Sequence, residues 1–143
     1  MRCLKINTED PLIQRALKEL DKECFPADLP CDPSVGTWWI MWDGKKVAGY
    51  ASIKPSLGIP GAAYLSRAGV MPEYRGRGLQ KRMIRVRLAY AKRNGFKEVV
   101  TDTSPGNVAS SNSLIACGFK LFQPERLWSF RYGLYWRKKL VHP

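Results

Sequence analysis

Glycines and arginines gather in residues 70–80, which read VMPEYRGRGLQ, between a predicted strand and a predicted helix. Pro72 stops the strand, and the first N–H groups of a helix have no acceptor within that helix. These groups carry the positive end of the helix dipole and therefore attract anions. Gly76 and Gly78 let the backbone approach a ligand closely, and Arg75 and Arg77 add positive charge. We predict a diphosphate-binding turn here; the simpler alternative is a helix start that contains two glycines and exposes two arginines.

Other common sites find no support in the sequence. Neither the dinucleotide pattern G-x-G-x-x-G nor the phosphate-loop pattern G-x-x-x-x-G-K-[ST] occurs. A zinc site needs clustered ligands at short spacing. The four cysteines, Cys3, Cys24, Cys31 and Cys117, form no C-x-x-C pair, and the only histidine is His142. We expect reduced thiols and no metal.

Length and charge limit what the chain does. The 143 residues fit a single domain over residues 1–143. With 24 Lys and Arg against 12 Asp and Glu, the net charge is +12. This excess favours a polyanionic partner such as nucleic acid, a ribosome, an acidic protein or a phosphate-rich cofactor; a solvated basic surface is the alternative. No run approaches the roughly 18 apolar residues of a membrane span, and the first residues lack an apolar leader, so we expect a cytoplasmic protein without membrane contact.

Hydrophobic periodicity and turn residues predict a mixed α/β (α+β) domain in the order β-α-β-β-β-α-β-α-β-β. Thr8 is the predicted N-cap of the first helix. The predicted strands are residues 2–6, 37–42, 47–54, 63–71, 96–103, 119–123 and 128–137, and the predicted helices are residues 9–24, 77–94 and 107–117.

Two of these elements carry ambiguous patterns. In the helix at 77–94, a buried stripe is predicted at Leu79, Met83, Val86 and Tyr90. The basic residues beside the stripe indicate either a solvated face or a groove for an acidic or nucleic-acid partner. The strand at 128–137 alternates, which predicts one buried face or, with interleaved arginines, a base-stacking surface. The buried face would comprise Trp128, Phe130, Tyr132, Leu134 and Trp136.

The turn resembles the signature of the Gcn5-related N-acetyltransferases, V-x-P-x-x-R-G-x-G between a strand and a long helix. Val70, Pro72, Arg75, Gly76 and Gly78 fit this pattern, whereas Gln80 stands where the family usually has Gly or Ala. A second landmark of the family is an Asn that opens the next helix, with Gly-Phe eleven residues later. Asn107 and Gly118-Phe119 match it, and the resemblance spans residues 37 to about 123.

The resemblance implies a central sheet of six to seven strands, split by a V-shaped cleft, with helices on both faces. It also implies that acetyl-coenzyme A (acetyl-CoA) binds in the cleft. Its pantetheine arm would pair with the backbone of Ala68, Gly69 and Val70, its pyrophosphate would lie on the turn, and Asn107 would contact it. The turn comprises Arg75, Gly76, Arg77, Gly78, Leu79 and Gln80. One of Lys81, Arg82 and Arg85 would meet the 3′-phosphate. Residues 25–36 and 121–128 would wall the acceptor pocket.

The reaction that the resemblance implies is direct attack of an amine on the acetyl thioester, which makes the chain an N-acetyltransferase. The usual acid of the family is a Tyr four residues before the Gly of Gly-Phe, where this chain has Leu114. Substitutes on the same helix are Ser110, Ser113 and Cys117. No general base stands out, and a water chain is an alternative. The candidate bases are Glu73, Asp102, Asp28 and Asp32.

A second hypothesis remains open. With Leu114 in place of Tyr and a charge of +12, the chain is alternatively a catalytically weak or inactive member that binds nucleic acid, a ribosome or an acidic protein. The amine acceptor itself is either a small molecule or a macromolecule, and the protein is a monomer or a homodimer.

Overall fold

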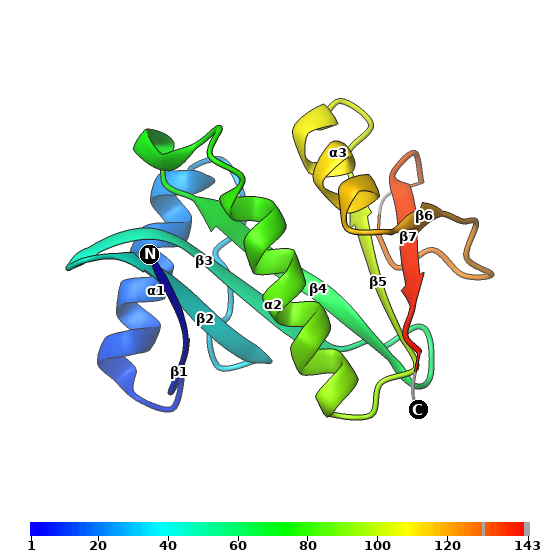
Figure 1. Ribbon diagram of the computed structural model, residues 1–143, viewed down its shortest axis with the longest axis horizontal. Coiled ribbons are helices and arrows are strands. Elements are labelled where there is room, and N and C mark those ends of the chain that lie inside the picture. The colour runs from blue at the N-terminus through cyan, green and yellow to red at the C-terminus, as the bar shows by residue number, and fades with distance from the viewer. Residues whose placement is uncertain (130, 142–143) are drawn as a thin grey trace.

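A computed structural model describes residues 1–129 and 131–141. In this part of the chain, seven strands form one sheet in the order β1-β2-β3-β4-β5-β7-β6 (Figure 1). The strands are β1 Arg2–Ile6, β2 Thr37–Asp43, β3 Lys46–Pro55, β4 Ala62–Val70, β5 Glu98–Thr103, β6 Lys120–Leu121 and β7 Leu134–Lys139. The helices are α1 Pro11–Cys24, α2 Leu79–Arg93 and α3 Val108–Ala116, with a short 3₁₀ turn η1 at Pro72–Tyr74. The predicted element order and mixed α/β class are confirmed.

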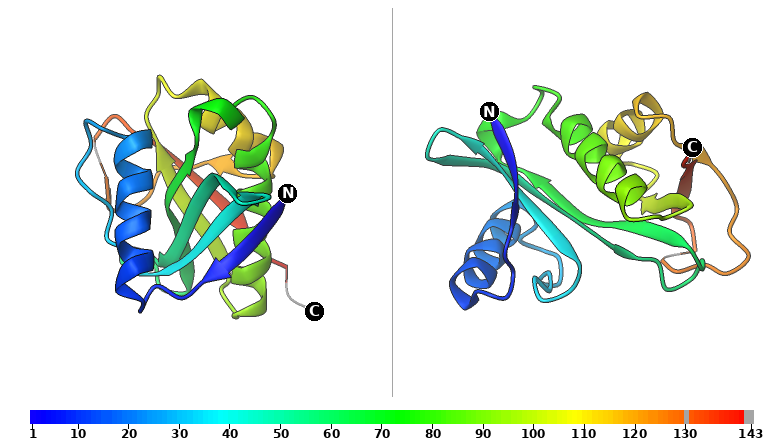
Figure 2. Two further views of the ribbon diagram at one scale, coloured as in Figure 1. Left: turned by 90° about the vertical axis from the view of Figure 1, so that its left-hand side faces the viewer. Right: turned by 60° about the horizontal axis from the view of Figure 1, so that its bottom comes forward.

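The helices lie on both faces of the sheet, as predicted. Figure 2 shows α1 on one face and α2 with α3 on the other. On the α1 face, Leu17 packs in a buried cluster with Trp38 and Tyr50. On the α2 face, Met83 packs with Ala51 and Met41. Among the described residues, no helix has the length and apolar character that crossing a membrane requires.

The sheet splits between β4 and β5. These strands run parallel and pair only at Ala62↔Glu98, Ala63↔Val99 and Tyr64↔Val100. Just past these pairs, the Thr101 hydroxyl donates to Leu65 O (3.0 Å). Beyond it β5 stays paired with β7 through Thr103↔Leu134, whereas β4 continues beside β3 to Val70. The two halves of the sheet therefore diverge and leave a V-shaped cleft.

A β-bulge in β4 lies where the strands part. Between the pairs Ala51↔Ala68 and Ile53↔Leu65, β4 places Ser66 and Arg67 opposite the single residue Ser52 of β3. A bulge leaves ladder groups unpaired and bends its strand. The buried Ser52 hydroxyl accepts from the Arg67 N–H (3.1 Å) and bonds the Ser66 hydroxyl (2.7 Å). Ser52 thus supplies the acceptor that the interrupted ladder lacks.

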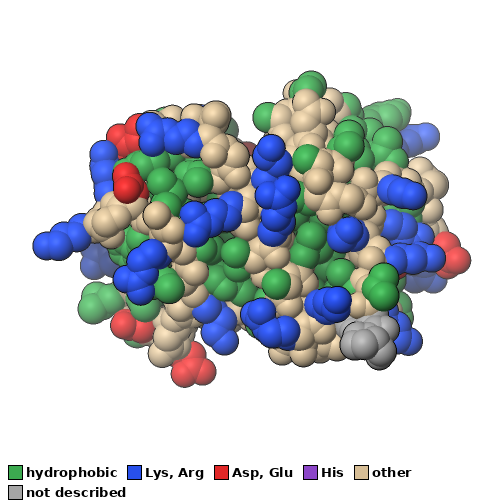
Figure 3. All heavy atoms as spheres, in the orientation of Figure 1, with side chains coloured by type: hydrophobic (Ala, Val, Ile, Leu, Met, Phe, Trp, Pro, Cys, Tyr) green, Lys and Arg blue, Asp and Glu red, His purple; other side chains and the backbone are tan. Residues whose placement is uncertain are grey.

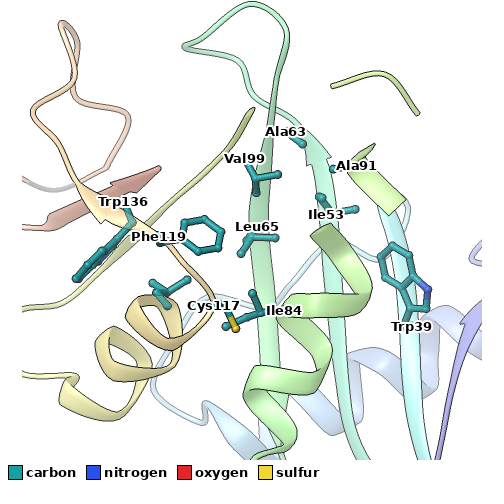
Figure 4. Packing of buried hydrophobic residues seen from close by; sticks show 11 residues of the cluster. Trp39, Ile53, Ala63, Leu65, Ile84, Ala91, Val99, Cys117, Phe119 and Trp136 are labelled. Carbon is teal, nitrogen blue, oxygen red and sulfur yellow. The ribbon is translucent and has the colours of Figure 1, made fainter. Parts of the chain in front are cut away.

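A hydrophobic cluster closes the narrow end of the cleft (Figure 4). Leu65 of β4, Ile84 of α2 and Val99 of β5 meet there, together with Phe119 and Trp136. Because these side chains come from both halves of the sheet, their burial fixes the angle between the halves. Apolar burial of this kind contributes roughly 25 cal/mol per Å².

The buried face of α2 is wider than the predicted stripe. Leu79 and Met83 are buried as expected, but Val86 and Tyr90 are only half-buried. Ile84, Arg87 and Ala91 are buried instead. The helix packs against the sheet and against α3 at once, so its apolar stripe covers two neighbours rather than one.

The last predicted strand begins later than expected. β7 starts at Leu134 rather than at residue 128, and Trp128 belongs to the preceding connection. The Trp128 indole donates to Asp102 (3.0 Å), a long-range contact that strand periodicity does not reveal. Phe130 of the predicted buried face lies outside the described residues. At the other end of the chain, Asp10 rather than Thr8 caps α1, and its side chain accepts from the Leu12 N–H.

A buried carboxylate ties α1 to the bulge. Asp21 is 1% exposed and accepts from the Tyr50 hydroxyl (2.6 Å) and from Arg67 through Nε (2.7 Å) and Nη2 (3.0 Å). The Cys31 N–H donates to it as well (3.1 Å). Burial alone would raise the pKa of Asp21, but the hydrogen bonds from Arg67 and Tyr50 outweigh burial and lower it. This network fixes Arg67 on the α1 face of the cleft.

We predict that Ser52→Ala lowers the free energy of unfolding by about 1–3 kcal/mol, because it leaves the half-buried Arg67 N–H without an acceptor. Ser66→Ala, the matched control, removes only the hydroxyl pair and should cost less than about 1 kcal/mol. Urea denaturation measures both. Equal losses in the two variants would contradict the role assigned to Ser52.

Asp21→Asn should destabilise the protein by about 3 kcal/mol at pH 7, because it breaks a buried ion pair. Since the folded-state pKa of Asp21 lies below its ordinary value of 3.8, the carboxylate stabilises the fold above that value. This contribution is lost as the pH falls from 3.8 through the lowered folded-state pKa, so the deficit of the variant should be constant above about pH 5 and shrink below about pH 4. Glu19→Gln, on the exposed face of α1, should have almost no effect. A deficit independent of pH would contradict the assignment.

Candidate active site

Two adjoining cavities fill the cleft. The inner one, of about 310 Å³, lies between β4, β5 and α2. The outer one, of about 640 Å³, lies between the end of β4, the start of α2 and α3. They share Phe25, Ala68, Gln80, Asn107 and Ser110, so they form one continuous space. In Figure 3 the surface is notched between the part that carries η1 and the part that carries α3.

The start of α2 opens onto the outer cavity. The first hydrogen bond within the helix runs from the Arg82 N–H to Gly78 O (3.2 Å). The N–H groups of Leu79, Gln80 and Lys81 therefore have no acceptor within the helix, and all three residues line the cavity. Gly76 and Gly78 have φ of 78° and 77°, the left-handed region that favours glycine. The turn thus presents free donors to the cavity, the arrangement that binds phosphate groups.

The arginines of the turn are held by backbone carbonyls. Arg75 Nε donates to Val70 O (3.0 Å), and Arg77 Nη2 donates to Glu73 O (3.3 Å). Arg77 also lies over the Tyr74 ring at 5.2 Å. Arg75 lines the outer cavity whereas Arg77 does not. The turn therefore keeps its shape through its own contacts, and Arg75 is the nearer of the two cations to a bound anion.

The end of β4 offers a free backbone edge. Ala68, Gly69 and Val70 pair with β3 on one side, while β5 has diverged on the other. All three line the outer cavity. A Cβ on Gly69 would lie 2.6 Å from the Tyr50 ring, so close packing requires glycine there. Val70 O already accepts from Arg75 Nε, so an extended ligand with amide groups finds its backbone partners along this edge chiefly at Ala68 and Gly69.

Helix α3 forms the opposite wall. Asn107 caps it by accepting from the Ser110 N–H (3.2 Å), and both residues line both cavities. Ser113 lines the outer cavity, and Leu114 lines the inner one. The Cys117 thiol points to Lys81 O (3.8 Å) and lines neither cavity, which disfavours it as an acid.

Asp102 of β5 lines the inner cavity. Its Oδ1 accepts from the Tyr64 hydroxyl (2.6 Å) and from the Trp128 indole (3.0 Å). Its Oδ2 accepts no hydrogen bond from the described residues. Burial, followed by the hydrogen bond to Asp102, raises the pKa of Tyr64, so Tyr64 acts as a neutral donor. The arrangement orients a carboxylate in the cleft with one oxygen available.

The other candidate carboxylates lie elsewhere. Glu73 forms an exposed ion pair with Lys46 (3.1 Å) and lines neither cavity. Asp28 pairs with Arg67 (3.3 Å), and Asp32 accepts from the Ser34 hydroxyl and N–H. This geometry favours Asp102 over Glu73, Asp28 and Asp32 as a base.

The roles of several side chains in or beside the cleft were not found from the sequence. Tyr64 and Trp128 orient Asp102, Arg67 lines the inner cavity, and Arg87 lines it from α2. Only Arg87 left a local signal, because it follows Leu79 and Met83 at the i+4 spacing of one buried face. The other three depend on contacts between residues far apart in the chain.

The sequence of this chain is similar to those of known acetyltransferases. Residues 5–119 match the acetyltransferase (GNAT) family. Two curated relatives from Rattus norvegicus are N-acetyltransferase 8F1, 27% identical over 59% of this chain and 40% of its own length, and N-acetyltransferase 8B, 26% identical over 64% and 44%. The chain therefore spans less than half the length of these relatives.

Solved structures share the fold at low identity. A putative acetyltransferase from Salmonella typhimurium, solved with acetyl-CoA, has a TM-score of 0.79 at 16% identity and covers 100% of this chain and 95% of its own. A Bacillus subtilis acetyltransferase, solved with CoA, has a TM-score of 0.73 at 16% identity over 98% and 99%. The ribosomal-protein-S18-alanine N-acetyltransferase of Escherichia coli has a TM-score of 0.76 at 14% identity over 99% and 95%. With its split sheet, its glycine turn and a match over residues 5–119, the chain belongs to the acetyltransferase (GNAT) family, whose cofactor is acetyl-CoA.

Proposed function

We propose that this protein transfers the acetyl group of acetyl-CoA to an amine, and that Asp102 binds this amine and accepts its proton. The observation that carries the proposal is one continuous cleft with free helix N–H groups at its outer end and an oriented carboxylate at its inner end. The first feature suits the anionic end of the cofactor. The second suits a cationic or proton-donating acceptor.

The cofactor would lie along the outer cavity. Its pyrophosphate would accept from the N–H groups at the start of α2, in the turn from Arg75 to Gln80. Its pantetheine amides would pair with the free edge of Ala68, Gly69 and Val70, and Asn107 would contact it from α3. The half-buried Gln80 lines both cavities, so its side chain would contact the pantetheine arm where the family usually has only Gly or Ala.

Transfer requires a deprotonated amine. The free oxygen of Asp102 would take a proton from the ammonium form, directly or through a water. The amine nitrogen then attacks the thioester carbon, so that a C–N bond forms as the C–S bond breaks. Backbone N–H groups on the free edge of β4 would stabilise the oxyanion. The products are the acetylated amine and the thiol of CoA.

The acceptor would enter from the α1 face. Phe25, Tyr64, Ser66 and Arg67 line the inner cavity on that side, and a further cavity of about 330 Å³ adjoins it beside Leu29 to Asp32. These contacts support the predicted role of residues 25–36 in the acceptor pocket. The contact of Trp128 with Asp102 supports the same role for residues 121–128.

The basic surface supports a macromolecular acceptor. Within the described part of the chain, only Arg15, Lys46, Arg67 and Arg137 have a carboxylate within 4.0 Å. Most of the 24 cations are therefore available to a polyanion. An amine carried by a ribosome, a nucleic-acid complex or an acidic protein fits this charge. A member that binds such a partner without acetyl transfer is the second candidate, favoured by Leu114.

We expect Gly78→Glu to weaken acetyl-CoA binding by about 100-fold or more, because a carboxylate beside the pyrophosphate repels it. Gly95→Glu is the matched control: Gly95 has φ of 80° at the other end of α2 and open space around it, so it carries the same backbone strain and charge. Titration calorimetry at two salt concentrations measures both variants. Wild-type affinity in Gly78→Glu would contradict the site.

Asp102→Asn should lower kcat by about 10²–10⁴-fold, as expected for loss of a general base, with acetyl-CoA affinity unchanged. Glu73→Gln should keep wild-type activity. A thiol-release assay over a panel of amines, including basic peptides, measures turnover. Full activity in Asp102→Asn would exclude it as the base, and no turnover by the wild type with any amine would favour the second candidate.

A further inference from the structure

Arg87 is a buried cation at the inner end of the cleft. The residue is 2% exposed, although it belongs to the basic helix α2. Its Nε donates to Met83 O (3.2 Å), and its Nη1 donates to Ser52 O (3.0 Å). The guanidinium therefore enters the sheet at the bulge, where Ser52 faces Ser66 and Arg67. Both of its acceptors are neutral carbonyls.

No carboxylate compensates this charge within the described part of the chain. Asp21 is engaged by Arg67 and Tyr50. Asp102 lines the same cavity, but its hydrogen bonds come from Tyr64 and Trp128 rather than from Arg87. The ionisable groups that favour its charged form are the thiols of Cys3 and Cys117. Burial lowers the pKa of Arg87 to about 10, so it is still protonated at neutral pH. A buried charge without a counterion is unfavourable, so an anion at this point would be stabilised.

The unpaired side of the guanidinium faces the cleft. Nη2 donates to no described residue, and Arg87 lines the inner cavity together with Leu114, Ser66 and Thr101. Leu114 holds the position of the usual acid of the family and has no proton to donate. The inner cavity therefore has a fixed positive charge, whereas the family's usual proton donor is missing from it.

We propose that Arg87 faces the sulfur of bound CoA and stabilises the thiolate that leaves during acetyl transfer. The inference rests on the proposed function. When the C–S bond breaks, the sulfur keeps the bonding pair and becomes negative, while the amine proton goes to Asp102 or water. The guanidinium keeps its own proton and supplies only charge, which acts strongly in a water-poor site. Solvent protonates the thiolate afterwards.

The inference predicts that the protein lowers the pKa of the thiol of bound CoA. A cation within about 4–6 Å lowers such a pKa by a unit or more from about 8.5. CoA should then bind increasingly well at high pH compared with desulfo-CoA, in which hydrogen replaces the thiol. From pH 6.5 to 9.5 the ratio of the two affinities should rise about tenfold.

The comparison of two ligands removes the titrations of the protein itself. Cys3 of β1 and Cys117, which follows α3, lie near Arg87, Arg82 lies near Cys3, and Asp102, Tyr64 and Arg67 line the same cavity. A group that does not contact the sulfur has the same effect on the binding of either ligand, so its effect cancels in the ratio. Only a group that interacts with the thiol or thiolate of CoA changes the ratio of the two affinities.

Titration calorimetry of the wild type, Arg87→Met and Arg93→Met with both ligands tests the inference. Arg93 is an exposed cation in the last turn of α2 and serves as the control. We expect the ratio to rise in the wild type and in Arg93→Met and to change less than about twofold in Arg87→Met. A flat ratio in the wild type overturns the inference even if Arg87→Met does not fold. An equal rise in folded Arg87→Met also overturns it, whereas failure of both ligands to bind overturns the proposed function itself.

Discussion

The cleft depends on how the chain satisfies the polar groups that the bulge in β4 leaves without ladder partners. Two residues of β4 face the single residue Ser52 of β3, so a backbone N–H and a carbonyl lose their regular partners at a buried place. The Ser52 hydroxyl takes the N–H of Arg67, and Arg87 donates to Ser52 O. With these bonds made, β4 bends away from β5 at little cost. The cavity between the strands and the free edge at the end of β4 both follow from this bend.

Charge is distributed along the cleft in an order that suits acyl transfer. Free helix N–H groups and Arg75 lie at the outer end, where a diphosphate belongs. Arg87 lies inside, near the closed end, and Asp102 lies on β5 with one oxygen unused. An anionic cofactor is thus favoured along one wall and a cationic amine at the other. Electrostatic preorganisation of this kind places the cost of orienting charges in folding rather than in the reaction.

Most of the fold was predictable because local sequence patterns determine its helices, strands and turns. Alternation, helical periodicity and the glycines after α2 and α3 identified the element order, and the V-x-P-x-x-R-G-x-G segment located the turn before α2. The bulge was not predictable, since it arises from a register difference between Ser52 and a pair of residues in another strand. The roles of Tyr64 and Trp128 were missed for the same reason. Periodicity placed Trp128 in a strand, but its bond to Asp102 comes from a connection that no local pattern describes.

The central claim is that the cofactor occupies the space from the start of α2 to the free edge of β4. Amide NMR spectra of the labelled protein, recorded with and without saturating acetyl-CoA, test it most directly. The account predicts large shifts for the amides of Gly76, Gly78 and Gln80 and for those of Ala68 to Val70, with little change in the β2–β3 hairpin around Gly44. Saturable binding that leaves the amides of residues 76–81 unshifted would contradict it.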